Sequence, residues 1–359
     1  MNIFFELIQV AMGVRESLSS VPKDRAEWEA LYAVAGKHNL LAYTFPVIDK
    51  LHDEVDVPLG VYSRWAMVCE KICQKNRRMN ECCRKLYADF LADGFHSCVL
   101  KGQSAAAYYP RPELRHCGDI DIWLEGGEKR IMEYIKPRFP VKVVFYHHCE
   151  TAIFKGINVE AHFMPSWMNS PCADRRLQKF FDAKAQEQFG HYVDELGFCV
   201  PTKRFDAVYQ LIHIYRHVLD EGIGLRQLLD YYYVLNALSP EDRSSALADI
   251  KQLKLNKFAA GIMSVMKEVF ALDEGLMLCP PDVSQGAFLI DEIMASGNFG
   301  RFDERNRHAE HENRLMHARR KLTRSLRYMA YYPSEVLCIP VFMVRHYFWR
   351  LFRGYLKAV

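Results

Sequence analysis

Hydrophobic residues recur at three- and four-residue spacing over most of the chain, which predicts a largely helical protein. The longest such stretch covers residues 59–93 and is expected to end at Gly94, because glycine adopts the backbone conformation that follows a helix. Residues 1–10 and 24–51 follow the same pattern. The first quarter of the chain is therefore expected to be helical.

The hydrophobic period changes to two between residues 95 and 165, which is typical of strands. Short alternating or apolar runs there predict strands at 97–101, 119–124, 141–146, 152–155 and 158–163. They are expected to form one mixed sheet, small enough to need helices on one face. Helical patterns return from about residue 172, interrupted by a hairpin-like excursion at 191–201. The predicted fold class is α+β.

These patterns divide the chain into three consecutive regions. An N-terminal helical region is expected at 1–95, a core built on the small mixed sheet at 96–200, and a C-terminal helical domain at 201–359. At 359 residues the chain is long enough for several structural units with substantial cores.

The strand predicted at 119–124 carries two carboxylates where a strand rarely has any. Ile120 and Ile122 are expected to face the core, so Asp119 and Asp121 share the other face. Residues two apart on a strand lie about 6.6–6.8 Å apart, and a hard cation lies about 2.0–2.6 Å from its oxygen ligands. The two carboxylates can therefore close on one or two divalent ions.

A third acid stands in a second alternating run, where Glu160 and His162 share one face of the predicted strand. If this strand pairs beside the first, Glu160 lies about 5 Å from the aspartate pair, the distance between neighbouring strands. Three carboxylates would then converge on one spot.

The ordered set of these motifs resembles a bacterial family of nucleotidyltransferases in the DNA polymerase beta-like superfamily, over about residues 60–235. The motifs that carry the resemblance are Leu100-Lys101-Gly102, Tyr109-Pro110, Arg115, Gly118-Asp119-Ile120-Asp121 and Val159-Glu160-Ala161-His162. The resemblance implies an enzyme in which two Mg²⁺ or Mn²⁺ ions hold a nucleoside triphosphate (NTP). A nucleoside monophosphate then passes to an acceptor hydroxyl, and pyrophosphate is released. By position, Asp119, Asp121 and Glu160 match the catalytic metal ligands.

A glycine turn and several basic residues are candidates for substrate binding. Gly102 leaves room for phosphates to approach the backbone, with Gln103 and Ser104 as donors and the positive end of the following helix behind them. The other candidates are Lys101, Arg115, Gly118, Arg226 and Asp230. For Lys101 and Arg115 the alternative is a surface charge near acids. For Arg226 and Asp230 it is an ion pair on the surface of a helix pair.

The sequence departs from the superfamily pattern at two positions. Gly102 is followed by Gln103 where serine or glycine is usual, and Glu160 stands where aspartate is common. These departures motivate a second hypothesis, a nucleotide-binding or interaction module that has lost turnover. The acceptor, which could be a small molecule, an RNA or a protein, cannot be assigned from the sequence.

Cysteine and histidine usage predicts reduced thiols and no zinc finger. The 11 cysteines include no C-x-x-C pair, and the N-terminus lacks the features of a secretory signal, so a cytoplasmic protein is expected. His147-His148-Cys149 and the pair His213/His217 suggest zinc ligands. No four-ligand set with finger-like spacing accompanies them, so a structural metal is not expected.

Positive charge gathers at the C-terminal end. Residues 301–359 contain 13 Lys and Arg against 5 Asp and Glu, whereas the whole chain carries a net charge of only +3. Three alternatives are open for residues 314–332: a solvated helix face, an RNA contact helped by stacking tyrosines, or an anionic lipid contact. The arginines, lysine and tyrosines concerned are Arg314, Arg319, Arg320, Lys321, Arg324, Arg327, Tyr328, Tyr331 and Tyr332.

The apolar stretch at 336–344 is too short to cross a bilayer, which needs about 20 residues. We expect it to begin a core helix, with a helix lying on a membrane surface as the alternative.

Overall fold

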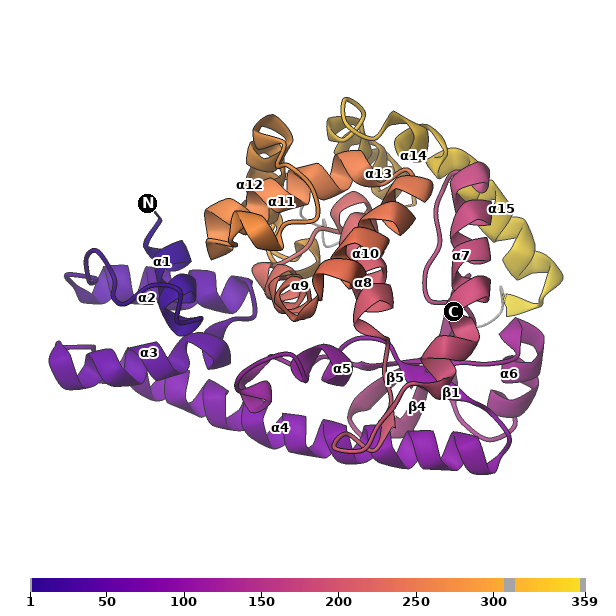
Figure 1. Cartoon of the computed structure of the whole chain (residues 1–359), viewed down its shortest axis with the longest axis horizontal. Helices are drawn as coiled ribbons and strands as arrows, with labels where there is room; N and C mark the ends of the chain where they lie inside the picture. Colours follow the sequence, from indigo (N-terminus) through magenta and orange to yellow (C-terminus); the bar gives the residue numbers. More distant parts are fainter. Residues whose placement is uncertain (1, 307–313, 356–359) are drawn as a thin grey trace. The chain divides into compact units, whose positions relative to one another are not determined.

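The computed structural model describes residues 2–306 and 314–355 (Figure 1). The helices of the first three hundred residues are α1 (Ile3–Ala11), α2 (Arg25–Lys37), α3 (Leu41–Glu54), α4 (Leu59–Ala92), α5 (Gln103–Ala106), α6 (Gly127–Ile135), α7 (Pro171–Gly190), α8 (Lys203–Asp220), α9 (Leu225–Ala237), α10 (Pro240–Gln252), α11 (Asn256–Phe270) and α12 (Val283–Ser296). Those that follow are α13 (Arg314–Arg327), α14 (Pro333–Leu337) and α15 (Ile339–Phe352). The strands are β1 (Ser97–Val99), β2 (Ile120–Leu124), β3 (Val141–Val144), β4 (His148–Phe154), β5 (Ile157–His162), β6 (Tyr192–Val193) and β7 (Phe198–Cys199).

Contacts divide the chain into two compact units, each made of separate stretches. The first unit consists of Met1–Arg77, Tyr108–His116 and Asp220–Glu312, and the second of Arg78–Ala107, Cys117–Leu219 and Asn313–Val359. The chain is thus grouped by contacts into interleaved stretches, and the first boundary falls inside α4. The three consecutive regions expected from the sequence stay a prediction.

The second unit is built on a mixed five-stranded sheet, which confirms the α+β fold class. The strand order is β1-β2-β5-β4-β3. Only β2 and β5 are parallel; the other neighbours pair in antiparallel fashion. The predicted hairpin-like excursion is the pair β6–β7.

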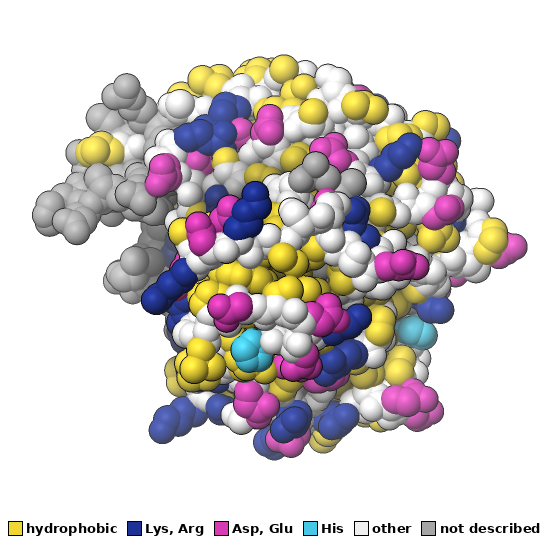
Figure 2. Space-filling model, turned by 90° about the vertical axis from the view of Figure 1, so that its left-hand side faces the viewer, with side chains coloured by type: hydrophobic (Ala, Val, Ile, Leu, Met, Phe, Trp, Pro, Cys, Tyr) yellow, Lys and Arg dark blue, Asp and Glu magenta, His cyan; other side chains and the backbone are white. Residues whose placement is uncertain are grey.

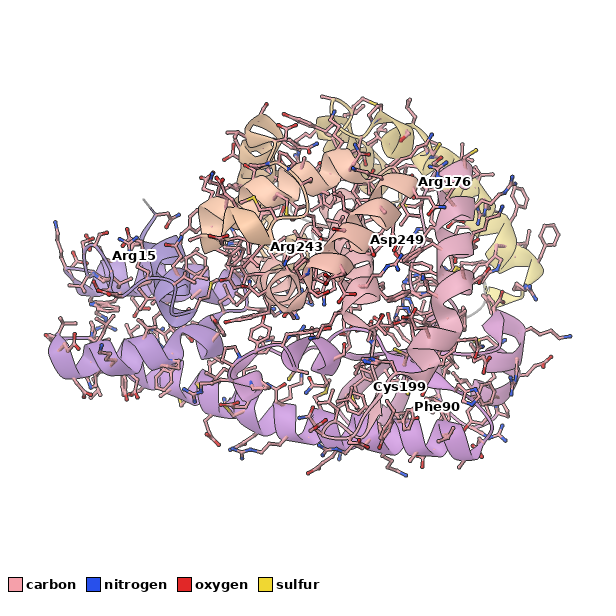
Figure 3. All side chains as sticks on the ribbon, in the orientation of Figure 1. Arg15, Phe90, Arg176, Cys199, Arg243 and Asp249 are labelled. Atoms are coloured by element: carbon pink, nitrogen blue, oxygen red, sulfur yellow. The ribbon has the colours of Figure 1, made fainter. Side chains whose placement is uncertain are left out.

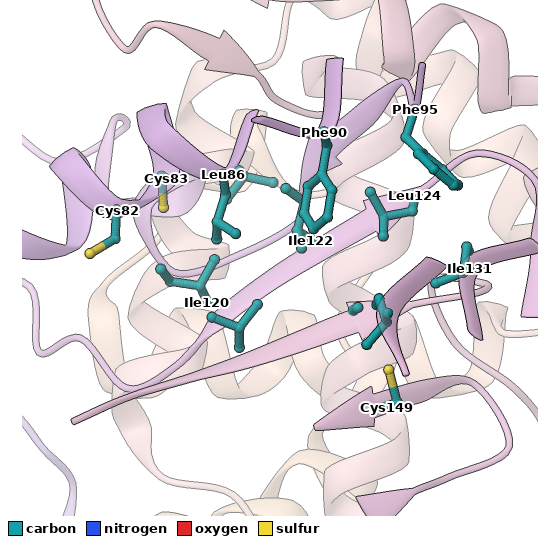
Figure 4. Packing of buried hydrophobic residues seen from close by; sticks show 14 of the residues in the cluster. Cys82, Cys83, Leu86, Phe90, Phe95, Ile120, Ile122, Leu124, Ile131 and Cys149 are labelled. Atoms are coloured by element: carbon teal, nitrogen blue, oxygen red, sulfur yellow. The ribbon is translucent and has the colours of Figure 1, made fainter. Parts of the chain in front are cut away.

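One face of this sheet packs on the C-terminal half of α4 (Figure 4). Ile120 and Ile122 point from β2 toward Leu86 and Phe90 of the helix, and all four side chains are buried. The apolar residues that recur every three or four positions in the helix thus pack against the apolar residues that alternate along the strand. Several thiols join this core, and all eleven cysteines of the chain are free.

The opposite face of the sheet is covered as well, so the expectation of helices on one face was wrong. Trp123 of β2 is only 5% exposed, and its ring packs near Phe181 of α7 and Phe205 of α8, at centroid distances of 6.4 and 6.1 Å. In Figure 1, α4 and α7 lie on opposite sides of the strands. Figure 3 shows the side chains of the same view, with Phe90 of α4 and Cys199 of β7 close to the sheet. Side chains on both faces of β2 are therefore shielded from solvent.

In its described residues the first unit contains helices and short turns. The side chain of Gln9 in α1 donates a 3.0 Å hydrogen bond to the backbone oxygen of Val269 in α11, which links the first and the last stretch of this unit. On the molecular face drawn in Figure 2, charged side chains of both signs are mixed with apolar ones. Such a mixture is typical of a solvated surface.

The C-terminal helices of the second unit bury part of the predicted basic and aromatic surface. The guanidinium of Arg324 donates hydrogen bonds to the carbonyl oxygens of Leu219 and Val218, at the C-terminal end of α8. Tyr328 is 1% exposed and Tyr332 5%, so neither ring is available to stack on an RNA base, whereas Tyr331 is half-buried. The RNA contact through residues 314–332 stays a prediction. The side chains of Arg314, Arg319, Arg320 and Lys321 lie outside the described residues.

Helix α15 is not a core helix, which corrects the expectation for the apolar stretch that begins it. None of its residues is buried, and Phe352 is 82% exposed. The other large apolar residues that it exposes are Val341, Met343, Val344, Tyr347, Phe348 and Leu351. Among the helices of residues 2–306 and 314–355, none combines the length and apolar character that a transmembrane span requires.

Candidate active site

The parallel pairing of β2 and β5 sets two of the three predicted acids side by side. In the register of this pair, Asp121 lies opposite Glu160. Side chains at paired positions point to the same face of a sheet. Together with His162, these acids offer three ligand atoms that all lie within 4.8 Å of one another. The prediction that the two acidic strands pair side by side is therefore confirmed.

Asp121 is 1% exposed and is held by two cationic or polar partners. The Nζ atom of Lys101 lies 2.9 Å from its Oδ1 atom, and Nε2 of His162 lies 3.1 Å from the same oxygen. The Lys101 side chain is 20% exposed, so it reaches in from the edge of the site. Lys101 thus points toward the acids.

Burial and charge shift the pKa values of the two acids in opposite directions. Burial alone would raise the pKa of Asp121, but the Lys101 ammonium and the hydrogen bond with His162 hold this pKa well below its ordinary value. Burial, followed by the charge of Asp121, raises the pKa of Glu160 from 4.5 to about 7. The site therefore pairs a permanently ionised carboxylate with one that exchanges its proton near neutral pH.

Asp119 lies just before the first residue of β2 and is half-buried. Its negative charge contributes to the raised pKa of Glu160, after burial and Asp121. Asp119 belongs to none of the groups of three close ligand atoms found in the described part of the chain. The structure therefore brings Asp121 and Glu160 into one cluster and leaves Asp119 beside it.

The predicted glycine turn connects β1 to α5. Gly102 has a φ of +66°, and a Cβ there would lie 3.4 Å from the backbone oxygen of Asp119. The positive φ at residue 102 favours glycine, whereas the distance to Asp119 is an ordinary van der Waals contact that a Cβ could make. Helix α5 has only four residues, so the expected contribution of a helix dipole is small.

The two residues after the turn are buried, whereas Gly118, the glycine before the acidic strand, is exposed. The Nε2 atom of Gln103 donates a 2.6 Å hydrogen bond to Oδ1 of Asn80. The Oε1 atom of Gln103 and Oγ of Ser104 are buried and have no hydrogen-bond partner among the described residues. Buried polar atoms of this kind are costly unless a ligand or water pairs with them.

The other predicted substrate contacts lie in the first unit and bind one another. Arg115 donates from Nε and Nη2 to the two carboxylate oxygens of Asp230, at 2.7 Å each, and Tyr109 donates to Oδ1 at 2.6 Å. Arg226 lies 3.6 Å from Asp230. All of these side chains are buried or nearly so, so the expected surface ion pair is an internal network.

Two histidines that were not predicted as site residues lie beside the acids. His147 precedes β4 and His148 begins it, and His148 pairs in register with His162. Burial lowers the pKa of His148 to about 2, and it lowers the pKa of His147 well below its ordinary value, so both rings are neutral. The signal available in the sequence was the adjacent His147-His148 pair, whose third partner comes from another strand.

The donor chemistry of Asp121 and Glu160 fits a hard divalent ion such as Mg²⁺, which prefers carboxylate oxygens. A cation bound to Oδ1 of Asp121 would have to displace the Lys101 ammonium, which lies against that oxygen. Asp119 would add a carboxylate ligand from outside this cluster.

A family model described as "Uncharacterised nucleotidyltransferase" matches residues 24–271. The matched residues include β2, β5, the glycine turn and the network around Asp230. No curated protein matches the sequence.

Proposed function

Since the chain belongs to this family of uncharacterised nucleotidyltransferases, we propose that it transfers a nucleoside monophosphate from an NTP to an acceptor hydroxyl. A bond forms between the acceptor oxygen and the α-phosphorus, and the bond from that phosphorus to the bridging oxygen of the β-phosphate breaks. Pyrophosphate leaves. The observation that carries the proposal is the register of Asp121 opposite Glu160, which supports a two-carboxylate site on neighbouring strands.

The two acids take different roles in this proposal because their pKa values differ. Glu160, whose pKa is about 7 when no cation is bound, accepts the proton of the acceptor hydroxyl. Asp121 stays ionised and, with Glu160 and Asp119, would hold Mg²⁺ or Mn²⁺. Bound divalent ions would neutralise charge that develops on the transferring phosphoryl group.

The glycine turn and Lys101 would bind the phosphates. The Oγ atom of Ser104, which has no partner in the part of the chain that the structure describes, and the positive φ at Gly102 support a phosphate contact here. Lys101 would exchange its contact with Asp121 for a phosphate oxygen when NTP enters with its metal ions. This exchange keeps the ammonium paired in both states.

The test is transfer of label from α-³²P-labelled NTPs to a cell-extract acceptor pool by purified protein, with Mg²⁺ or Mn²⁺. We expect adduct and pyrophosphate from the wild type, and a loss of about 100-fold or more in Asp121→Asn and Glu160→Gln, since each removes a group that acts on the transition state. Asp182→Asn, on the exposed surface of α7, is the matched control. Equal rates in all four proteins would refute the proposal.

A second candidate function is nucleotide binding without turnover. The 2.9 Å ion pair between Lys101 and Asp121 favours it, because the ammonium already neutralises the carboxylate that a metal ion would use. Binding of an NTP by calorimetry, with no pyrophosphate formed from any of the four NTPs and a broad acceptor pool, would select this function over catalysis.

A third candidate is attachment to a membrane surface through α15, whose exposed apolar residues support it. Vesicles of anionic lipid should then sediment the wild type, and Phe348→Ser/Phe352→Ser should lower the bound fraction about 10-fold. Equal sedimentation of the two proteins would exclude this function for α15.

A further inference from the structure

Three buried histidines from two strands meet at the edge of the acidic cluster. The ring centroids lie 4.2 Å apart for His147 and His148, 5.3 Å for His147 and His162, and 5.1 Å for His148 and His162. Each ring offers one nitrogen, and the three nitrogens all lie within 4.8 Å of one another. The antiparallel pairing of β4 and β5 produces this arrangement, because it places His148 opposite His162.

The hydrogen bonds of the three rings are incomplete. Nδ1 of His148 lies 2.8 Å from Nε2 of His147, so one of the two rings donates a hydrogen bond to the other. Nε2 of His148 and Nδ1 of His162 are buried and have no hydrogen-bond partner within the described residues. Buried nitrogens are normally paired with a protein group, a water or an ion, so these two nitrogens can accept a further partner.

The chemistry of these donors differs from that of the acids. Imidazole nitrogen is a preferred ligand of Zn²⁺, Cu²⁺, Ni²⁺ and Fe²⁺, whereas Mg²⁺ prefers oxygen. Zinc binds histidine nitrogen at about 2.0–2.1 Å, which places two tetrahedral ligands about 3.4 Å apart. The three nitrogens lie within 4.8 Å of one another, so a tetrahedral site requires the side chains to move until each pair is about 3.4 Å apart.

We propose that His147, His148 and His162 bind one transition-metal ion of the Zn²⁺ type, at a site that adjoins the proposed Mg²⁺ ligands at Glu160. The Oε2 atom of Glu160 lies 3.7 Å from Nε2 of His148 and 3.5 Å from Nε2 of His162. This carboxylate borders both sites and is the candidate fourth ligand. The site does not rest on the proposed nucleotidyl transfer.

The experiment uses Co²⁺, a spectroscopic probe for Zn²⁺ sites, with the full-length chain stripped of metal by EDTA. We expect one Co²⁺ per chain, visible absorption bands stronger than those of aqueous Co²⁺, and loss of the bands when Zn²⁺ is added. His148→Gln and His162→Gln should each weaken binding about 10-fold or more, since removal of one ligand breaks the set. Absence of enhanced absorption in the wild type would overturn the proposal.

His213→Gln/His217→Gln is the matched control, since it removes an adjacent histidine pair on α8 whose rings lie 4.2 Å apart. This control should bind Co²⁺ as the wild type does. Loss of binding in the control, with retention in His148→Gln, would assign the metal to α8 and refute the proposal.

Two further measurements identify the ligands directly and separate the metal site from the proposed function. X-ray absorption of the Zn²⁺-loaded wild type should show about three imidazole ligands. This measurement does not depend on whether a variant folds. Fewer than two imidazole ligands would contradict the site. Asp119→Asn should bind Co²⁺ normally even when it does not transfer nucleotide. Co²⁺ binding by a wild-type protein that transfers no nucleotide would refute the proposed function and leave this site intact.

Discussion

The Nζ atom of Lys101 lies 2.9 Å from Oδ1 of Asp121, in a part of the sheet where the carboxylate is almost fully shielded from solvent. Lys101 follows β1 and Asp121 lies in β2, and the antiparallel pairing of these strands brings the two residues together. The attraction between opposite charges is stronger where solvent is excluded, and an unpaired buried charge is costly. We therefore expect the pair to stabilise the fold as well as to take part in the chemistry of the site.

A double-mutant cycle on this pair should reveal strong coupling. Lys101→Met and Asp121→Asn should each destabilise the protein by roughly 3–5 kcal/mol, because each leaves one buried partner unmatched. The double variant should lose clearly less than the sum. The measurement is urea unfolding followed by circular dichroism, in EDTA.

The control pair is Lys85 and Asp89 on α4, which lie 2.9 Å apart with side chains 63% and 52% exposed. Its coupling should be less than about 0.5 kcal/mol, since water screens it. Equal coupling in the two pairs would show that Lys101 and Asp121 are not paired in a shielded environment.

The raised pKa of Glu160 predicts that stability falls as the pH rises. Between its ordinary pKa of 4.5 and its folded value of about 7, the folded state binds more protons than the unfolded state. The free energy of unfolding should therefore decrease across this window, by at most roughly 3 kcal/mol from this group. Urea unfolding in EDTA from pH 4.5 to 8 measures the slope.

Glu160→Gln should flatten this dependence, because glutamine does not titrate. A slope identical to that of the wild type would contradict the assigned pKa shift of Glu160.

The network around Asp230 predicts a structural role for Arg115. Arg115→Met should lower the free energy of unfolding by roughly 3–5 kcal/mol, because it leaves the buried carboxylate of Asp230 without its bidentate partner. Arg111→Met is the control: Arg111 is 57% exposed and pairs with Glu113, so its loss should cost less than about 1 kcal/mol. If both variants were equally stable, the substrate-binding role expected from the sequence would regain support.

Gly300 should tolerate no side chain. It has a φ of +65°, and a Cβ would overlap the backbone oxygen of Glu221. Gly300→Ala should therefore cost roughly 3 kcal/mol or more, from left-handed strain plus the clash. Gly13→Ala, at a φ of +76° with nothing within 4 Å of its Cβ, should cost only about 1–2 kcal/mol. Thermal unfolding of both variants compares them, and equal losses would contradict the clash.

Much of the fold could be predicted because local periodicity encodes local structure. The long helix predicted at 59–93 is α4, and the five predicted strands all form, although β4 begins four residues earlier than expected. The alternation around Ile120 placed Asp121 on the face opposite the core, and the β2–β5 pairing then set it beside Glu160, as expected. The catalytic roles of these acids stay a prediction.

Periodicity alone could not predict which side chains from distant segments would meet. Arg115 and Asp230 stand 115 residues apart, and their contact depends on how separate stretches of the first unit pack. Likewise, His147 and His148 stand beside Cys149 in the sequence, whereas the histidine that completes their cluster, His162, is brought to them by strand pairing.

By itself the sequence determined the helices, the strands and the order of the acidic motifs, because these depend on neighbours within a few residues. Tertiary structure decided that both faces of β2 are covered, that Lys101 turns toward Asp121, and that α15 leaves its apolar residues exposed. The reason is that burial and charge pairing depend on which surfaces meet in three dimensions, and that meeting sets the energy of every polar group at the site.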